Sequence, residues 1–434
     1  MSERIDTLVI CSTLNQITNY LMIKKYKPKN IFNITYSDSK ENDKWDQYLD
    51  SSIEENITNI EIDIKDLSYF EDVKKIIKEK IKDIEEIYWH ITGGQRLISL
   101  AIKDIIRDRE KDKFLYIEGN TEKLMINDYK FENSIEEDYF DCNLTFGKAL
   151  KLVGFKLNDK SKDKSNKSED IKSMIEKQIK QEDEEKYNFY VNLYDFLNDE
   201  KEENFFEIRK CYIDSVPQTN KKDKKIEFTE NYKTSYKNAL LFSNRLKESI
   251  QKKYIKEVFE KIKKEDKDNK LDINKDKGFN NLLKNQSPIG YIFENIIFYK
   301  ICSILEKKDS KHNKIVDIIG SMKTLSERKE IKGIVDELDI ALLTSTGKII
   351  NLECKSGGMS GDNAKSNKYT TYRLSGVFGM PYLVSLLKKN EDLQNEKEEF
   401  IVKNIIGAYN SAKRAELNVI NFDELEEEIE KIIK

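Results

Sequence analysis

The sequence predicts an α/β protein in which two folded regions flank a charge-rich middle segment. Short apolar runs alternate with helical stretches over the first 120 residues, and a similar pattern resumes after residue 279. Alternation of this kind is typical of strands joined by crossover helices. A chain of 434 residues is also too long for one ordinary core. We therefore expect domains over residues 1–157 and 280–434, joined by a linker and helical connector over 158–279.

The N-terminal elements follow one another in the order of a doubly wound sheet. Short apolar runs predict strands near residues 5–11, 31–36, 60–64, 86–91 and 114–117. Apolar residues at helical spacing predict helices from about residue 14, over 73–81 and over 97–105. We expect residues 141–155 to close this domain.

The C-terminal region predicts a second α/β domain that begins with a long helix. The expected elements are a helix over 289–305, strands over 334–343 and 348–354, a basic stretch followed by a helix, an apolar run over 381–387, a helix over 401–413, a strand over 418–421 and a final helix.

Charge and cysteine usage exclude several classes of protein. The 76 basic and 80 acidic residues give a net charge of −4, so nucleic acid could bind only through a local patch. Five scattered cysteines disfavour a disulfide framework and a zinc knuckle. The chain has no apolar run near 18 residues and no signal-peptide pattern, which predicts a soluble cytoplasmic protein with no membrane partner.

Two neighbouring strands near the C-terminus carry the most informative polar residues. Asp339 lies on the first, and Glu353 and Lys355 close the second. Because strand side chains alternate, Glu353 and Lys355 project from the same face. A three-residue turn over 345–347, with Gly347 in the left-handed conformation, would place Asp339 opposite Glu353. A turn of two or four residues would put the two acids on opposite faces.

Carboxylates brought together in this way point to a cation site. Two of them about 4 Å apart repel by roughly 4 kcal/mol at an effective dielectric of about 20. Mg²⁺ or Mn²⁺ would relieve this repulsion, lower the pKa of a bound water and stabilise charge on a phosphate. Lys355 could orient the attacking water or neutralise developing charge. The alternative is an ordinary hairpin whose wet face carries a glutamate and a lysine.

With these residues in place, the C-terminal region resembles the PD-(D/E)XK nuclease superfamily. The matching residues are Asp339 on one strand and Glu353-Cys354-Lys355 on the next. The resemblance implies that Asp339 and Glu353 hold the metal, that Lys355 assists the water, and that a further acid on the preceding helix supports the site. Glu294 is the candidate for that acid. Asp336 and Glu337 are rival ligands close to Asp339.

A basic and aromatic stretch follows Lys355. It suits backbone phosphates and unstacked bases, although a mobile solvated loop is an equal alternative. Its residues are Gly357, Gly358, Gly361, Lys365, Lys368, Tyr369, Tyr372 and Arg373.

A second candidate site lies at the carboxyl edge of the N-terminal sheet. Adjacent glycines after the fourth strand let the backbone approach a ligand, and the next helix offers free N–H groups to an anion. The loop after the first strand reaches the same edge. The candidate ligand-binding residues are Thr92, Gly93, Gly94, Gln95 and Arg96, with Ser12, Thr13, Asn15 and Gln16 from the other loop. The alternative is a tight structural turn, and His90 is expected to have no catalytic role.

The run Thr92-Gly-Gly-Gln-Arg96 resembles the strand-four turn of the CRISPR-associated Rossmann-fold (CARF) domain. Together the two regions resemble the type III CRISPR ancillary nucleases of the Can/Card kind. That resemblance implies a homodimer that binds a cyclic oligoadenylate, foremost cyclic tetra-adenylate, and then cuts or nicks DNA, with single-stranded RNA as a further candidate, using Mn²⁺ or Mg²⁺. The alternative function is a ligand-responsive regulator that binds nucleic acid without cleavage. A ribonuclease domain of the HEPN kind is disfavoured because the chain lacks Arg-x-x-x-x-His.

Overall fold

The computed structural model describes most of both predicted domains and part of the segment between them. It describes residues 4–36, 45–63, 65–138, 143–158, 170–198, 218–219, 226–227, 288–308, 314–328, 331–356, 358–386 and 399–433. Most of the predicted connector lies outside these ranges, as do residues 141, 142 and 357. Two short antiparallel strands, β9 (Gln218–Thr219) and β10 (Ile226–Glu227), are described there.

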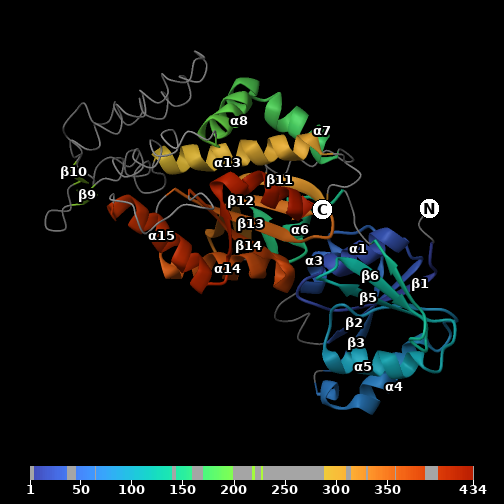
Figure 1. Cartoon of the computed structure of the whole chain (residues 1–434). Helices are drawn as coiled ribbons and strands as arrows, with labels where there is room; N and C mark the ends of the chain where they lie inside the picture. Colours follow the sequence, from blue (N-terminus) through green and yellow to red (C-terminus); the bar gives the residue numbers. More distant parts are fainter. Residues whose placement is uncertain are drawn as a thin grey trace.

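The N-terminal domain is built on a seven-stranded sheet in the order β3-β2-β1-β4-β5-β6-β7 (Figure 1). Its strands are β1 (Thr7–Cys11), β2 (Asn30–Tyr36), β3 (Ile57–Ile62), β4 (Tyr88–His90), β5 (Lys113–Glu118), β6 (Lys123–Asn127) and β7 (Ser134–Glu137). The first five are parallel, and β6 and β7 continue the sheet antiparallel. The strand order reverses between β1 and β4, which is where ligands collect in such sheets.

Helices cover both faces of this sheet. Helices α4 (Phe70–Ile81) and α5 (Arg96–Ile106) lie on the face turned away from the C-terminal domain, with the short η1 turn (Asp66–Ser68) beside α4 (Figure 1). Helices α1 (Ile17–Tyr26), α3 (Trp45–Asp50) and α6 (Phe146–Lys151) contribute to the core on the other face. Alternate residues of β1 divide between these two cores, as the pleat of a doubly covered strand requires.

The C-terminal domain has a six-stranded mixed sheet in the order β15-β14-β13-β12-β11-β8. Its strands are β8 (Phe155–Leu157), β11 (Ile315–Ser326), β12 (Ile334–Thr344), β13 (Ile349–Lys355), β14 (Met380–Ser385) and β15 (Asn418–Asn421). Strand β8 pairs with β11, so the chain enters this sheet at the predicted domain boundary.

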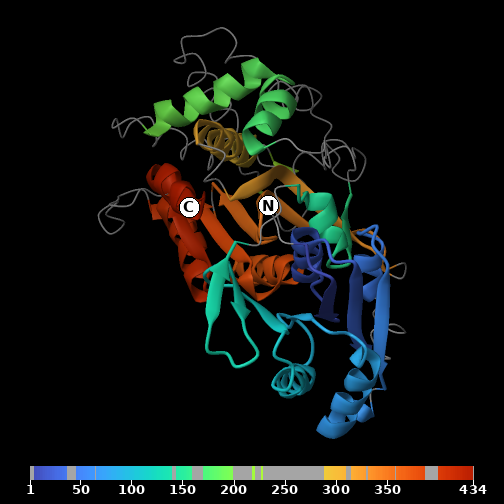
Figure 2. The same ribbon diagram turned by 90° about the vertical axis from the view of Figure 1, so that its right-hand side faces the viewer.

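Two helical layers enclose the second sheet, as Figures 1 and 2 show. The long helix α13 (Pro288–Lys307) packs on one face beneath α7 (Ile171–Met174), a π-helical turn (Ile175–Lys180) and α8 (Glu184–Asn198), with η6 (Phe422–Glu424) and α16 (Leu425–Ile433) alongside. The opposite face carries α14 (Gly361–Ser375), η5 (Gly376–Phe378) and α15 (Glu399–Arg414). Residues 170–198 of the predicted connector therefore contribute to the core around α13.

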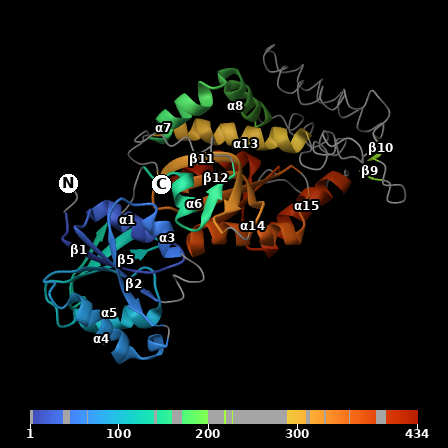
Figure 3. The ribbon, with the colours of Figure 1, turned by 180° about the vertical axis from the view of Figure 1, so that it is seen from behind.

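Helix α1 lies between the two sheets, which is clearest from behind in Figure 3. Its side chains are buried almost all round, unlike those of a surface helix. Ile17, Tyr20 and Leu21 share one hydrophobic cluster with Leu343 and Ile349 of the C-terminal sheet. The two domains thus share a continuous core and do not meet only across a polar surface.

The predicted parallel alternation is confirmed, while several elements have no counterpart in the prediction. Among them are α3, β6, β7 and β11. Helix α3 is six residues long, too short to show a helical period. The alternation of β11 is interrupted at Gly320 and at Ser321, which adopts a left-handed φ of 51°. None of the helices within the described ranges is long and apolar enough to cross a membrane.

Candidate active site and ligand-binding edge

The register of β12 and β13 is the one the acid pair requires. Ile340 pairs with Leu352 and Leu342 with Ile350, and the turn closes through a 2.9 Å bond from the Thr344 amide to the Lys348 carbonyl. Gly347 adopts a φ of 85°. The predicted three-residue turn is confirmed, and Asp339 lies one position beyond the paired residues, beside Glu353.

An irregular backbone conformation lies beside Asp339. Ser321 of β11 lies between residues paired with Leu338 and Ile340, and it has the left-handed backbone, while the pairing register is the same on both sides of it. Leu338 and Ile340 would share a face in a regular strand, yet they belong to different hydrophobic clusters. The regular alternation of β12 is therefore interrupted at Asp339, whose carboxylate accepts from the Cys354 amide of β13.

Asp339, Glu353 and Lys355 form one contact group. The Lys355 Nζ lies 2.5 Å from the Glu353 Oε1 and 3.5 Å from the Asp339 Oδ2. The main-chain amide of Cys354 donates to Asp339 Oδ2 at 2.9 Å. The lysine thus bridges the two acids, and a backbone bond from β13 fixes the acid on β12.

Glu294 on α13 completes an acidic cluster. Burial and, to a lesser extent, the charge of Asp339 raise its pKa to about 8, and the charge of Lys355 opposes this shift. Burial and the charge of Glu353 raise the pKa of Asp339 to about 6. Burial would lower the pKa of Lys355, but the charges of Asp339 and Glu353 outweigh it and raise that pKa. All four predicted catalytic side chains therefore sense one another electrostatically.

Helix α14 holds Glu353 from the other side. The Asn367 Nδ2 donates to the Glu353 Oε2 at 3.0 Å, and Asn351 Nδ2 donates to Thr371 Oγ1 at 2.9 Å. Ser360 caps the helix by accepting from the Asn363 amide. Asn367 was missed by sequence reasoning, and its only signal is its place on the helix that follows the lysine.

The rival ligands Asp336 and Glu337 have other partners. Asp336 is buried and accepts from Thr370, at 2.8 Å, and from Arg373, while Glu337 pairs on the surface with Lys323. Within the described part of the chain, neither forms a hydrogen bond or an ion pair with Lys355 or Glu353. The pairing with Arg373 neutralises Asp336 and leaves Asp339 as the acid nearest Glu353.

Much of the basic stretch after Lys355 lies in the helix expected before the apolar run, so the alternative of a loop is wrong for residues 361–375. Residues from Gly361 to Ser375 form α14 because Ser360 supplies the cap. Tyr369 and Tyr372 are exposed, while Lys368 pairs with Glu416. The exposed tyrosines could stack with bases.

The donor set of the cluster fits a hard divalent cation. Three acids face one lysine, so the side chains carry more negative charge than they neutralise. Among the described residues, no three His, Cys, Asp or Glu side chains are grouped so as to hold a metal ion by themselves. Asp339 and Glu353 nevertheless provide two carboxylates, and Mg²⁺ commonly completes such a set with water. The cluster therefore suits an ion held by two carboxylates and solvent.

The two predicted ligand loops meet at the carboxyl edge of the N-terminal sheet. A Cβ on Gly93 would lie 2.7 Å from Thr13 Cβ, so the loops touch only because residue 93 has no side chain. Gly94 has a φ of 89°, and a Cβ there would lie 2.6 Å from Cys11 Cβ. Both glycines are thus required by the turn itself.

The N-terminus of helix α5 lies at this edge and is accessible to a ligand. Gln95 occupies its N-cap without a side-chain cap bond, and Gly94, Gln95 and Arg96 are exposed. Uncapped N–H groups at a helix N-terminus attract anions. Residues 94–96 are therefore available to a phosphate.

Several predicted ligand residues instead face inward. Ser12 Oγ and Gln16 Nε2 donate to the Asp46 Oδ1 at 2.7 and 3.0 Å, and Thr35 Oγ1 donates to its Oδ2 at 2.6 Å. Asn15 Nδ2 reaches the Ser375 carbonyl of the C-terminal domain at 3.4 Å. Ser12 and Gln16 thus shape the loop from within, and Asp46 is a residue that sequence reasoning missed.

His90 belongs to the same buried polar network. Its Nδ1 lies 3.0 Å from Asn19 Oδ1 and its Nε2 2.8 Å from Thr92 Oγ1. Asn19 Nδ2 donates to the Cys11 carbonyl, which leaves Asn19 Oδ1 as acceptor and places the imidazole proton on Nδ1. Burial lowers the His90 pKa to about 3, so the ring is neutral. The Thr92 hydroxyl therefore donates to His90 Nε2, and its oxygen accepts from the Ile117 amide.

Fold and sites together define a class of two-domain α/β proteins. A Rossmann-like domain, whose carboxyl edge carries a helix N-terminus without a side-chain cap, packs on a restriction-endonuclease-like domain that carries an acid–lysine cluster. No protein-family model matches the sequence, and no curated protein matches it.

Two solved structures have this fold over the whole chain. Can2 from Sulfobacillus thermosulfidooxidans, solved in complex with cyclic tetra-adenylate, aligns with a TM-score of 0.59 at 14% identity, covering 99% of both chains. Protein VC1899 from Vibrio cholerae aligns with a TM-score of 0.63 at 14% identity, covering 99% of this chain and 97% of its own. The predicted fold class, an α/β protein with a Rossmann-like N-terminal domain and a restriction-endonuclease-like C-terminal domain, is confirmed.

Proposed function

We propose that the chain is a cyclic oligoadenylate-activated, metal-dependent nuclease of type III CRISPR defence that acts as a homodimer. The observation that carries this proposal is the cluster of Glu294, Asp339, Glu353 and Lys355 on a fold shared with Can2. Can2 was solved with cyclic tetra-adenylate, and we extend that ligand to this chain. DNA is the first expected substrate and single-stranded RNA the second.

Each residue of the cluster has a role that its contacts support. Asp339 and Glu353 would hold Mn²⁺ or Mg²⁺, which supplies an acidified water and neutralises charge on the phosphate. Lys355 is placed to donate to the attacking water or to the phosphate oxygen that gains charge. The Cys354 amide and Asn367 hold the two metal-binding carboxylates in place. Glu294 supports the site from α13.

The ligand would bind at the edge formed by residues 12–15 and 92–96. A cyclic oligoadenylate is a ring of phosphodiesters, and the open N-terminus of α5 and Arg96 offer charge-assisted donors to it. The close packing of Gly93 on Thr13 brings main-chain groups of both loops to one surface. We expect a second copy of the chain to complete the ring-shaped site.

The direct test is cleavage with each component omitted in turn. Protein, Mn²⁺ and cyclic tetra-adenylate are incubated with plasmid, single-stranded DNA and RNA. We expect cleavage only in the complete mixture. Cleavage without Mn²⁺ would overturn the metal assignment, and an unchanged rate without the ligand would overturn the activation.

Two arginines on α5 provide a matched pair of variants for the ligand edge. Arg96 begins the helix at the ligand edge, and Arg107 caps its other end. Arg96→Ala should weaken ligand binding in a titration, whereas Arg107→Ala should not. Equal affinities for both variants would remove Arg96 from the site.

One observation favours the alternative of a regulator that binds nucleic acid without cutting it. Lys355 already bridges Asp339 and Glu353, and no three potential metal-binding side chains of the described chain form a group. Under this alternative the lysine replaces the metal. Binding of a DNA duplex that depends on cyclic tetra-adenylate but never leads to cleavage with any divalent ion would establish it.

A further inference from the structure

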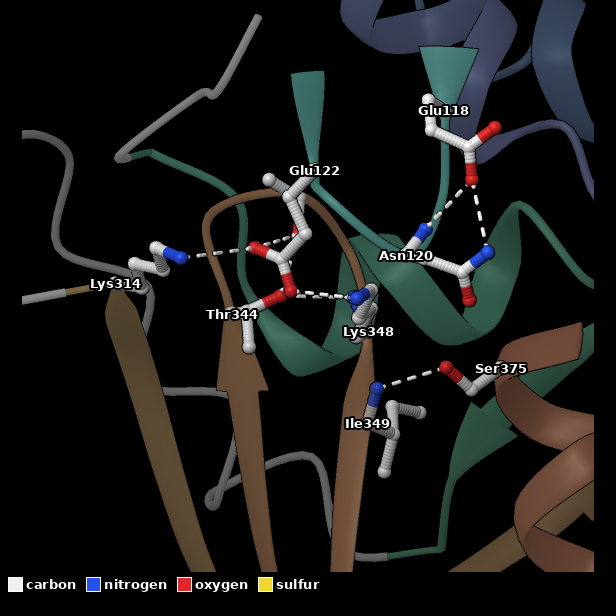
Figure 4. Close-up of polar contacts among 9 residues, drawn as sticks. Glu118, Asn120, Glu122, Lys314, Thr344, Lys348, Ile349 and Ser375 are labelled. Atoms are coloured by element: carbon white, nitrogen blue, oxygen red, sulfur yellow. Dashed lines mark hydrogen bonds and ion pairs between the residues drawn. The ribbon is translucent and has the colours of Figure 1, made fainter. Parts of the chain in front are cut away.

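The turn between β5 and β6 extends from the N-terminal domain and contacts the turn between β12 and β13 (Figure 4). The Lys348 Nζ lies 2.6 Å from the Glu122 Oε1, and the Lys314 Nζ lies 3.8 Å from the Glu122 Oε2. Thr346 Oγ1 donates to the same Oε2 at 3.3 Å. The Glu122 and Lys348 side chains are each only 13% exposed, so this ion pair is shielded from solvent. Shielded pairs are less weakened by salt than surface pairs.

Glu122 has a backbone conformation that is unusual for a residue with a side chain. Its φ is 56°, a left-handed value that favours glycine or asparagine. At the start of the same turn, Gly119 lies against the Phe378 ring, and a Cβ there would approach Phe378 Cζ to 2.1 Å. The Asn120 amide and side chain both donate to Glu118, which stiffens the turn (Figure 4).

A second contact joins the same elements through the ligand loop. Gly347 packs on Ile17, the first residue of α1. Asn15, a candidate ligand residue, donates to the carbonyl of Ser375, and the Ser375 Oγ accepts from the Ile349 amide at 2.8 Å. The loop after β1 therefore contacts the end of α14, which is itself bonded to the start of β13.

The two contacted elements, β13 and α14, lead directly to the residues proposed to be catalytic. Strand β13 runs from Ile349 to Glu353 and Lys355, and α14 runs back from Ser375 to Asn367, which donates to Glu353. No flexible loop separates the β12–β13 turn from β13, which begins at Ile349. A shift of the turn therefore moves the strand as well.

We propose that Glu122 is a positioning residue whose ion pair with Lys348 ties β13 to the N-terminal domain and so sets the placement of Glu353 and Lys355. Its regulatory consequence rests on the proposed function: a change at the ligand edge moves the turn and, with it, the acid–lysine group. The tie itself needs no ligand.

Hydrogen exchange of the full-length protein tests the tie without a ligand. The variants are Glu122→Lys, Glu122→Gln and the charge swap Glu122→Lys with Lys348→Glu. Glu85→Lys is the matched control, because Glu85 makes an exposed ion pair with Lys111 elsewhere in the N-terminal domain. The reporter is the 349–356 segment, in which the Cys354 amide donates to Asp339.

We expect exchange of this segment to be several-fold faster in Glu122→Lys, intermediate in Glu122→Gln, and restored by the charge swap. The Glu85→Lys control should match the wild type. If Glu122→Lys does not fold, Glu122→Gln carries the comparison. Exchange in the 349–356 segment that is equal to wild type in the folded Glu122 variants would overturn the proposal.

Cleavage measured with and without cyclic tetra-adenylate tests the regulatory consequence. Glu122→Lys should lose roughly fivefold or more of the ligand stimulation, a coupling of ordinary size, and the charge swap should recover it. If the ligand stimulates wild type and Glu122→Lys equally, Glu122 has no positioning role. If the ligand does not affect the wild type at all, the proposed function fails, and the exchange result still decides the tie.

Discussion

The buried polar network of the N-terminal domain and the acidic cluster of the C-terminal domain differ in how their carboxylates are neutralised or hydrogen-bonded. In the first, Asp46 is a single carboxylate that accepts from Ser12, Gln16 and Thr35. In the second, the three acids Glu294, Asp339 and Glu353 lie around the cation of Lys355, and the pKa values of Glu294 and Asp339 are raised by burial and by their neighbours' charges. One network is satisfied, and the other has unbalanced charge.

This difference indicates what each region is for. A satisfied buried network stabilises one conformation, here the loop that forms the ligand edge. Unbalanced acids destabilise the fold unless a cation joins them, and such arrangements are typical of functional sites. Substitutions should therefore separate stability from activity, in opposite senses in the two regions.

The largest effect is expected from Glu353→Gln. It removes one of the two carboxylates proposed to bind the metal while keeping the side-chain shape, so cleavage should fall by about 10³-fold. Stability should stay equal or rise, because the substitution removes the charge that repels the Asp339 carboxylate. Glu337→Gln on β12 is the matched control and should cleave normally. Loss of activity in the control alone would exchange the roles of the two acids.

Asp46→Ala should be the most destabilising substitution of those considered. It leaves three buried donors without their acceptor, at a cost of about 3 kcal/mol or more in the free energy of unfolding. Urea unfolding measures this cost. Asp46→Asn, which keeps an acceptor and lets the Thr35 hydroxyl turn, should lose less. An Asp46→Ala protein as stable as the wild type would show that the network does not hold the loop.

His90 should make the fold sensitive to acid. The unfolded chain takes up a proton on this residue near its ordinary pKa of 6.5, but the folded chain does so only near 3. Protonation below pH 6.5 therefore favours the unfolded state, and stability falls as the pH drops. The slope approaches about 1.4 kcal/mol per pH unit, or about 2 kcal/mol between pH 7 and 5. Urea unfolding at the two pH values should show this loss reduced in His90→Asn, and an identical loss in both proteins would rule out the role.

The smallest effect is expected from Asn367→Ala. It removes the hydrogen bond to Glu353 Oε2 but leaves the carboxylate and Lys355, so the rate should fall by about tenfold. Asn363→Ala, at an exposed position in the first turn of the same helix, should cleave as the wild type does. A single-turnover rate unchanged by Asn367→Ala would remove this residue from the site.

Local rules were enough to predict the geometry of the acid–lysine group. Strand alternation and a left-handed glycine specify the register of β12 and β13, and the structure has that register. The parallel order of the N-terminal strands follows from their spacing in the same way. Both predictions depend on residues that are close in sequence.

Contacts between distant segments could not be predicted in this way. Ser12 and Gln16 turn inward because Asp46 lies on a six-residue helix that has no helical signature. Nothing near Glu122 in the sequence indicates Lys348 as its partner. The shared core around α1 could not be predicted either. A helix that is apolar on most sides shows that it is buried, but it does not show that a second domain covers it.

Calorimetric titration of Mn²⁺ tests the central claim without any cleavage. We predict that the wild-type protein binds one ion per chain, and that Asp339→Asn and Glu353→Gln each lose this binding while Glu337→Gln keeps it. Equal binding by all four proteins, or none by the wild type, would contradict a cation site formed by these two acids.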